Sequence, residues 1–241
     1  MLEILGSITS GLATPLKEEH QVFFRRVLIP LHKVKELSSF NSQLQTCVKN
    51  YLEKMPALAV DLIKGMLRYW PITSPGKEVI FINEIEEVLD LTISQPEVKF
   101  AEFGPELLRK VVQTSQGMHY QAAEKSLLFL NSDVLKRLVS QNMEKCFPIV
   151  VKGFAQAQKT PHWNQTVVTI TFQVVRSYME LNKAKFEQLS SSGTNEEKQR
   201  KQKQADSKAK WDALCRKHKI EEPVSQFPLV QYKPPEDWFD Q

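Results

Sequence analysis

The side chains best placed for binding chemistry lie at the start of the chain, where the spacing predicts two successive helices. Ile4 and Ile8 are four residues apart and therefore share one helical face. Lys17 and His20 begin the next helix and come level with Ile8 if the chain turns back near residues 12–14. An apolar surface bordered by an ammonium group and an imidazole would suit a short peptide in which a carboxylate follows an aliphatic residue.

These four residues also allow a simpler interpretation. Apolar stripes on helices usually face the core, so Ile4 and Ile8 can be core residues, with Lys17 and His20 as ordinary surface side chains. The same helix has a second apolar side, formed by Leu5 and followed by Leu12, which one neighbouring helix would not fully cover. Taken without other information, the residue pattern favours the core interpretation.

Residue patterns that carry catalysis are absent from the sequence. It contains no Gly-rich phosphate loop, no His-Glu-x-x-His or Gly-x-Ser-x-Gly motif, and no cysteine pair at a metal-ligand spacing. Adjacent acids such as Glu86 and Glu87 point in different directions on a helix, which favours a solvated face over an acid–base pair. We therefore expect a protein that is not an enzyme and has no catalytic residue, no metal site and no cofactor.

The composition is that of a folded protein with a hydrophobic core. Hydrophobic residues make up 41% of the 241 residues and charged residues 25%. No apolar run approaches eighteen residues, so we expect no membrane span. Cys47, Cys146 and Cys215 are too few and too far apart for a disulfide framework, which predicts buried, reduced thiols and a location in the cytoplasm or nucleus.

Charge is unevenly distributed along the chain. Of the net charge of +4, residues 1–194 carry +3, residues 195–219 carry +5 and residues 220–241 carry −4. A nearly neutral body gives little support for a nucleic-acid groove, so we expect no nucleic acid among the partners. The basic run contains Glu196/Arg200 and Glu197/Lys201 pairs in the stabilising order, which favours a solvated charged helix over a nucleic-acid-binding one.

Helix signals recur along the first 190 residues with a period of about forty. A capping residue before proline marks several predicted starts, at Thr14-Pro15, Ser74-Pro75, Gly104-Pro105 and Thr160-Pro161. Inner helices are predicted to begin near Asn41, Lys77, Met118 and His162, and outer helices near Lys17, Pro56, Pro105 and Asn142. The β-branched run 167–172 continues with helical spacing, so we predict a helix there too. The pattern predicts an all-α fold, a HEAT-like α-solenoid of antiparallel helix pairs.

Three regions follow from the composition. Residues 1–190 are predicted to form the solenoid, and residues 191–219 a linker and a basic charged helix that begins after the Ser/Gly-rich break. Residues 220–241 form a Pro-rich acidic tail that we expect to be extended or disordered.

Several segments are similar, in order and spacing, to those of one known family. They are residues 2–8, 13–20, 27–34, 69–71, 77–79, 83–90, 162–164 and 179–182, with the charged helix that bears Trp211. Through them the chain resembles the B-prime regulatory subunits of the heterotrimeric Ser/Thr protein phosphatase 2A, to about residue 215. The resemblance implies a solenoid that binds the phosphatase scaffold (A) subunit and the catalytic (C) subunit, and that selects substrate or adaptor proteins carrying short linear motifs of the form Leu-x-x-Ile-x-Glu.

The resemblance also implies roles for the four residues at the start of the chain. Ile4 and Ile8 match positions that receive the isoleucine of the motif, and Lys17 and His20 match basic positions around its glutamate. For these residues the resemblance therefore reverses the preference for a core role. The family's array begins further upstream, so we expect the helices that complete the pocket to precede Met1. Residues 113–135 diverge from the family, and no contacts are carried over there.

Two alternatives remain open at this point. One is a generic HEAT-repeat adaptor or transport scaffold unrelated to a phosphatase, which the ordered similarity disfavours. The other concerns Trp70-Pro71 and His162-Trp163, whose large aromatic rings beside helix starts suit either contact with a partner or packing between repeats.

Overall fold

The computed structural model describes residues 2–157, 162–190 and 205–211. Every regular element in these residues is a helix and none is a β-strand, which confirms the all-α prediction. The chain divides into one compact unit that ends at Ser190 and a second unit from Ser191 onward. In the second unit only the helix at residues 205–211 is described, so the linker before it and the acidic tail lie outside the described residues.

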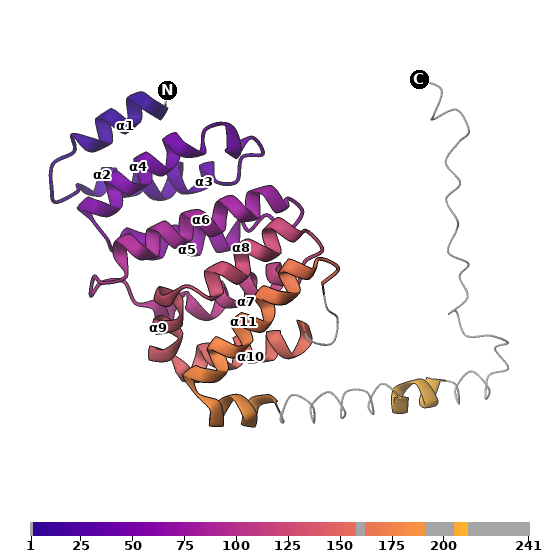
Figure 1. Ribbon diagram of the computed structural model, residues 1–241. Helices are drawn as coiled ribbons and strands as arrows, with labels where there is room; N and C mark the ends of the chain where they lie inside the picture. Colours follow the sequence, from indigo (N-terminus) through magenta and orange to yellow (C-terminus); the bar gives the residue numbers. More distant parts are fainter. Residues whose placement is uncertain (1, 158–161, 191–204, 212–241) are drawn as a thin grey trace, which may run out of the picture. The chain divides into compact units, whose positions relative to one another are not determined.

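The first unit consists of two rows of stacked helices (Figure 1). The inner row contains α1 (Leu2–Ser10), α4 (Asn41–Lys54), α6 (Pro75–Thr92), α8 (Tyr120–Leu130) and α11 (Gln165–Leu181), each packed against the next. The outer row contains α2 (Glu18–Phe23) with the π-helix η1 (Phe24–Leu28) and α3 (Ile29–Leu31), then α5 (Leu58–Arg68), α7 (Gly104–Ser115) and α10 (Met143–Ala157). This arrangement confirms the predicted helix pairs and their approximate starts.

Short elements join the rows. They are the 3-10 helices η2 (Leu37–Ser39) and η3 (Phe100–Glu102) and the helix α9 (Asp133–Gln141). The helix α9 was not predicted, although Ser132 caps it by accepting a hydrogen bond from the Leu135 N–H at 3.3 Å. A further helical segment spans residues 183–190.

The proline start signals are only partly correct. Pro75 and Pro105 lie in the first turns of α6 and α7, where a missing N–H removes no helical hydrogen bond. Thr14-Pro15 is instead a cis peptide in the loop before α2, and Lys17 stands at the N-cap. Thr160-Pro161 lies outside the described residues, and α11 starts at Gln165 after Asn164, whose side chain caps the Thr166 N–H at 2.9 Å.

The outer row departs from a regular α-helix at one place. Pro30 has no N–H, so it cannot donate the hydrogen bond that a helix interior requires, and its ring crowds the preceding turn. The backbone widens into the π-helix η1 just before it and returns to α-helix in α3. Phe24 and Leu28 of η1 are nevertheless fully buried, so the adjustment keeps the apolar face on the core.

One continuous hydrophobic core runs between the two rows. The two layers approach closely where α5 meets α3, because Gly65 has no side chain and the methyl group of Ile29 fills that space. Cys47 and Cys146 are buried free thiols, as predicted, and Cys215 lies outside the described residues.

Gly65→Ala should destabilise the protein, because its added methyl group would overlap with Ile29 Cγ2 on a side chain that is branched at Cβ and cannot easily move away. We expect a loss of about 1–3 kcal/mol in the free energy of unfolding, the usual range for overpacking. Gly76→Ala is the matched control, since a methyl group there meets nothing within 4 Å and alanine favours helix. Thermal melting of both variants checks this. Equal stability of the two variants would contradict the close approach at Gly65.

Candidate functional site

Helix α1 is fixed to its neighbour α4 by polar side chains from α4. The Asn50 amide donates to the Gly6 carbonyl at 3.1 Å and to Thr9 Oγ1 at 3.0 Å. The Lys54 ammonium donates to the carbonyls of Ser10 and Leu12 at 3.0 and 2.8 Å. The last carbonyls of a helix have no partner within it, so this lysine satisfies the one at Ser10, where α1 ends, and complements the helix dipole.

The fixed orientation of α1 decides which of its residues face outward. Thr9 is buried and Leu5 packs against the core, whereas Ile4 and Ile8 are 67% and 57% exposed. The two isoleucines therefore do not belong to the core of the described residues. They form an uncovered aliphatic face, four residues apart as the spacing predicted.

Lys17 and His20 lie at the start of the next helix. Lys17 is exposed, and His20 is half-buried in the first turn of α2, with its Nδ1 atom buried and without a hydrogen-bond partner among the described residues. The buried Leu16 and the hydrogen bond from Gln21 Nε2 to the Leu16 carbonyl at 3.2 Å hold this turn in place. No hydrogen bond or ion pair among the described residues joins these two residues to α1, so their meeting with the isoleucines stays a prediction.

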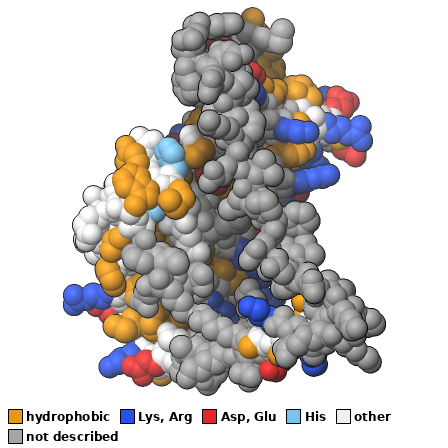
Figure 2. All heavy atoms as spheres, turned by 90° about the vertical axis from the view of Figure 1, so that its right-hand side faces the viewer, with side chains coloured by type: hydrophobic (Ala, Val, Ile, Leu, Met, Phe, Trp, Pro, Cys, Tyr) orange, Lys and Arg blue, Asp and Glu red, His pale blue; other side chains and the backbone are white. Residues whose placement is uncertain are grey.

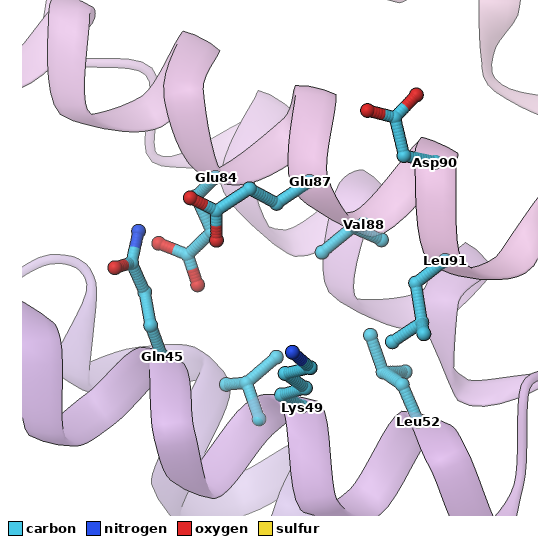
Figure 3. Close-up of a pocket in the computed structure, with 9 residues that line it drawn as sticks. Gln45, Lys49, Leu52, Glu84, Glu87, Val88, Asp90 and Leu91 are labelled. Atoms are coloured by element: carbon cyan, nitrogen blue, oxygen red, sulfur yellow. The ribbon is translucent and has the colours of Figure 1, made fainter.

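A second candidate site is a groove between α4 and α6, shown in Figure 3. Its volume is about 500 Å³, within the usual range for ligand sites. The buried side chains Val48, Leu52 and Val88 form an apolar floor. Around them are Gln45 and Lys49 from α4, and Glu84, Glu87, Asp90 and Leu91 from α6. The groove was not predicted from the sequence.

Glu84 is the unusual member of this groove. Its side chain is only 2% exposed, and its Oε1 atom lies 2.9 Å from Nε2 of His32, which is fully buried. The other nitrogen, Nδ1, lies 2.9 Å from the Ile29 carbonyl, so it must carry a proton. The second oxygen of Glu84, Oε2, is buried and has no partner among the described residues.

The environment of His32 favours its protonated form. Burial by itself would lower the pKa of this imidazole, because a charge is costly away from water. The hydrogen bond and the negative charge of Glu84, together with the backbone carbonyl of Ile29, outweigh burial and raise the pKa of His32 above 6.5. The contact therefore links the outer and inner rows through a buried ion pair.

A signal for Glu84 was present in the sequence. It lies three residues after Phe81 and four before Val88, on the stripe that the structure buries. A carboxylate on a buried stripe needs a partner, which is a reason to look for one. Glu86 and Glu87 were interpreted as solvated, and Glu86 does form an ion pair at 2.6 Å with the part-buried Lys125, whereas Glu87 lines the groove.

The two aromatic candidates for partner contact behave differently. Trp70 is 7% exposed and donates from Nε1 to Glu78 at 3.0 Å, which is a packing role. Trp163 is 64% exposed and donates to the Met118 carbonyl at 2.8 Å, with the ring of Tyr120 6.3 Å away. In the face that Figure 2 shows, hydrophobic and histidine side chains lie next to one another on part of the surface.

The described residues contain neither a metal-binding cluster nor a membrane-spanning helix. In residues 2–157, 162–190 and 205–211, no three His, Cys, Asp or Glu side chains cluster in a way that could hold a metal ion. No helix within these same ranges has the length and apolarity to cross a bilayer.

Comparison with known proteins places these features in a family. Residues 1–218 match the family model described as protein phosphatase 2A regulatory B subunit (B56 family). The mouse 56 kDa regulatory subunit alpha isoform of Ser/Thr protein phosphatase 2A is 38% identical over 89% of this chain and 43% of its own length. The human beta isoform is 42% identical over 83% of this chain and 39% of its own length. The rice B' kappa isoform is 42% identical over 77% of this chain and 36% of its own length. The chain thus spans about two fifths of the length of these relatives.

The buried pair gives a prediction for stability against pH. The folded-state pKa of His32 is raised above 6.5. The stabilisation that the protonated imidazole adds to the free energy of unfolding is therefore fully present below pH 6.5, and it is lost as the pH rises through the folded-state pKa. Glu84→Gln leaves a buried imidazolium without its counter-charge. We therefore expect the free energy of unfolding to fall by about 3–5 kcal/mol, with the largest decrease below pH 6.5. Denaturant unfolding at pH 5.5 to 8.5 measures this. A deficit that grows with rising pH would contradict the ion pair.

Proposed function

Because the chain belongs to the B56 family of protein phosphatase 2A regulatory B subunits, we propose that it is a non-catalytic subunit that directs the phosphatase to its substrates. Its proposed partners are the scaffold (A) subunit, the catalytic (C) subunit, and substrate or adaptor proteins with short linear motifs of the Leu-x-x-Ile-x-Glu type. We propose that it acts in the cytoplasm and the nucleus. The chemistry of phosphate release would belong to the catalytic subunit.

The observation that supports motif binding is the uncovered aliphatic face of α1. Ile4 and Ile8 are exposed although the helix that carries them is fixed on its opposite side by Asn50 and Lys54. An isoleucine of a bound peptide that became fully enclosed against this face would contribute about 1.5–3 kcal/mol.

The carboxylate of the peptide would be bound by the start of α2. Lys17 presents an ammonium group, and His20 has a ring that is half-buried and lacks a partner for Nδ1 among the described residues. Charge-assisted hydrogen bonds from these groups to a glutamate are stronger than neutral ones. A glutamate two residues after the isoleucine would then select this peptide against one with an aliphatic residue alone.

Capture of this kind explains how a subunit without catalytic groups can raise the rate of a reaction. A peptide held on the regulatory subunit keeps nearby phosphorylated residues close to the catalytic subunit, with an effective concentration on the order of millimolar for short tethers. The alternative, a generic HEAT adaptor, would bind neither phosphatase subunit.

Peptide binding should depend on all four residues. A fluorescent peptide that contains Leu-x-x-Ile-x-Glu should bind the chain. His20→Ala should make the free energy of peptide binding less favourable by about 1–3 kcal/mol, as expected when a charged group loses a hydrogen-bond partner. Ile8→Ala should also weaken it, whereas Ile72→Ala should not, although Ile72 is similarly exposed at 61%. Anisotropy titrations measure the affinities. Affinity unchanged by His20→Ala and Lys17→Ala would place the peptide elsewhere.

Assembly with the phosphatase distinguishes the two candidate functions. The purified chain should co-elute with a preformed complex of scaffold and catalytic subunits in size-exclusion chromatography, and it should release no phosphate by itself. A chain that remains separate at micromolar concentrations of all three proteins would favour the generic adaptor. Metal-dependent phosphate release by the isolated chain would contradict its role as a non-catalytic subunit.

A further inference from the structure

We propose that a groove between α9 and the C-terminal end of α11 binds a phosphoserine or phosphothreonine in a segment of a partner protein, with Arg137 as the main ligand of the phosphate. The volume of the groove is about 490 Å³, within the usual range for ligand sites. The groove lies at the opposite end of the helix stack from α1 and α2 (Figure 1). The proposal therefore rests neither on motif binding at α1 nor on assembly with a phosphatase.

The first step concerns the polar face of α9. The apolar residues of this helix are buried in the core of the first unit. Its remaining face carries five polar side chains at helical spacing, and all of them line the groove: Asp133, Lys136, Arg137, Ser140 and Gln141. From the other side α11 contributes Ser177, Glu180 and Leu181. The polar side chains of two helices thus surround one concave space.

The second step concerns the charge of the groove. Both carboxylates that line it are already paired, since Asp133 Oδ1 lies 3.0 Å from Lys136 Nζ and Glu180 Oε1 lies 3.1 Å from Arg176 Nε. Arg137 forms no ion pair with another described residue. The charge that is left unmatched is therefore positive, which favours an anionic ligand.

The third step separates a phosphate from a carboxylate. A guanidinium group such as that of Arg137 can donate two parallel hydrogen bonds to two oxygens of one anion. Ser140, Gln141 and Ser177 offer further donors, and their side chains form no hydrogen bond with another described residue. A carboxylate has only two oxygens, which the guanidinium already engages, whereas a phosphorylated side chain has three and carries more negative charge. A phosphate can therefore accept hydrogen bonds from both helices at once.

The fourth step separates a peptide from a lipid surface as the carrier of the phosphate. The carboxylates of Asp133 and Glu180 are largely exposed at the groove. An anionic membrane would bring many negative charges close to both carboxylates, which is unfavourable. A single phosphorylated residue of a peptide contacts only the groove itself. The exposed side chain of Leu181 offers apolar contact to a neighbouring residue of the same peptide.

The test uses three short capped peptides that differ only at the central residue, which is phosphoserine, glutamate or serine. Binding to the full chain is followed by NMR chemical-shift titration. The phosphoserine peptide should perturb α9 and the end of α11 and bind tightest. The serine peptide should be at least about tenfold weaker, because the loss of a hydrogen bond to a charged group amounts to that factor or more. The glutamate peptide should lie between them, since it keeps a negative charge but lacks the third oxygen.

Two arginine variants locate the phosphate. Arg137→Gln should weaken the phosphoserine peptide at least about tenfold without affecting the core, because Arg137 is exposed. Arg68→Gln is the matched control, because Arg68 is also exposed, ends α5 and does not line the groove. It removes the same charge, which salt screens at a distance, so affinity should change less than about twofold.

Two variants in α11 test the other side of the groove. Ser177→Ala should weaken the phosphoserine peptide about threefold, as expected for the loss of one hydrogen bond from an uncharged donor. Glu180→Gln should instead strengthen binding about threefold, because it removes a negative charge beside the phosphate, and exposed charge pairs have effects of this size. Partial unfolding of a variant would not produce this gain in affinity.

The outcomes that overturn the proposal are distinct. Equal affinities of the phosphoserine and serine peptides, or shifts confined to residues outside α9 and α11, would exclude the groove. Equal losses in Arg137→Gln and Arg68→Gln would indicate a diffuse effect of net charge. Inorganic phosphate that binds as tightly as the phosphoserine peptide would indicate a site for the free anion. Vesicles with phosphoinositides that sediment the chain but not Arg137→Gln would indicate a membrane site. None of these results affects binding of an Ile-x-Glu peptide at α1, so the two proposals fail separately.

Discussion

The two-sided packing of α4 is the constraint on which both candidate sites depend. On one side Asn50 and Lys54 fix α1 and thereby leave Ile4 and Ile8 uncovered. On the other side α4 faces α6 across the groove. In a stack of helices each member contacts only its neighbours. A shift in the position of α4 would therefore alter both the isoleucine face and the groove.

The buried pair of His32 and Glu84 has a cost that apolar packing would not have. Removing two charges from water is expensive, and an apolar pair of the same size would often be at least as stable. The pair nevertheless fixes the position of a carboxylate at the base of the groove, with one oxygen bound and one free. A residue held in this way loses little conformational freedom when a ligand arrives, which favours binding.

Much of the fold could be predicted from the sequence because helix periodicity is a local property. The starts of the inner and outer helices and the helix at residues 167–172 followed from spacing and capping alone. The π-helix η1 and the cis peptide at Thr14-Pro15 could not be predicted, since packing against other helices determines them. The same holds for His32 and Glu84, which are 52 residues apart and meet only when the rows stack. Spacing singled out Ile4, Ile8, Lys17 and His20 but favoured a core role for the isoleucines, because spacing alone does not distinguish an exposed apolar face from a buried one. Only the family resemblance favoured a binding role.

Hydrogen exchange measured by mass spectrometry would test the central claim most directly. The chain is compared with and without a peptide that contains Leu-x-x-Ile-x-Glu, and the amides that become protected mark the bound surface. Binding at the isoleucine face predicts slower exchange in α1 and α2, because a bound peptide reduces their local opening. Protection elsewhere in the solenoid with no change in α1 and α2 would contradict the account.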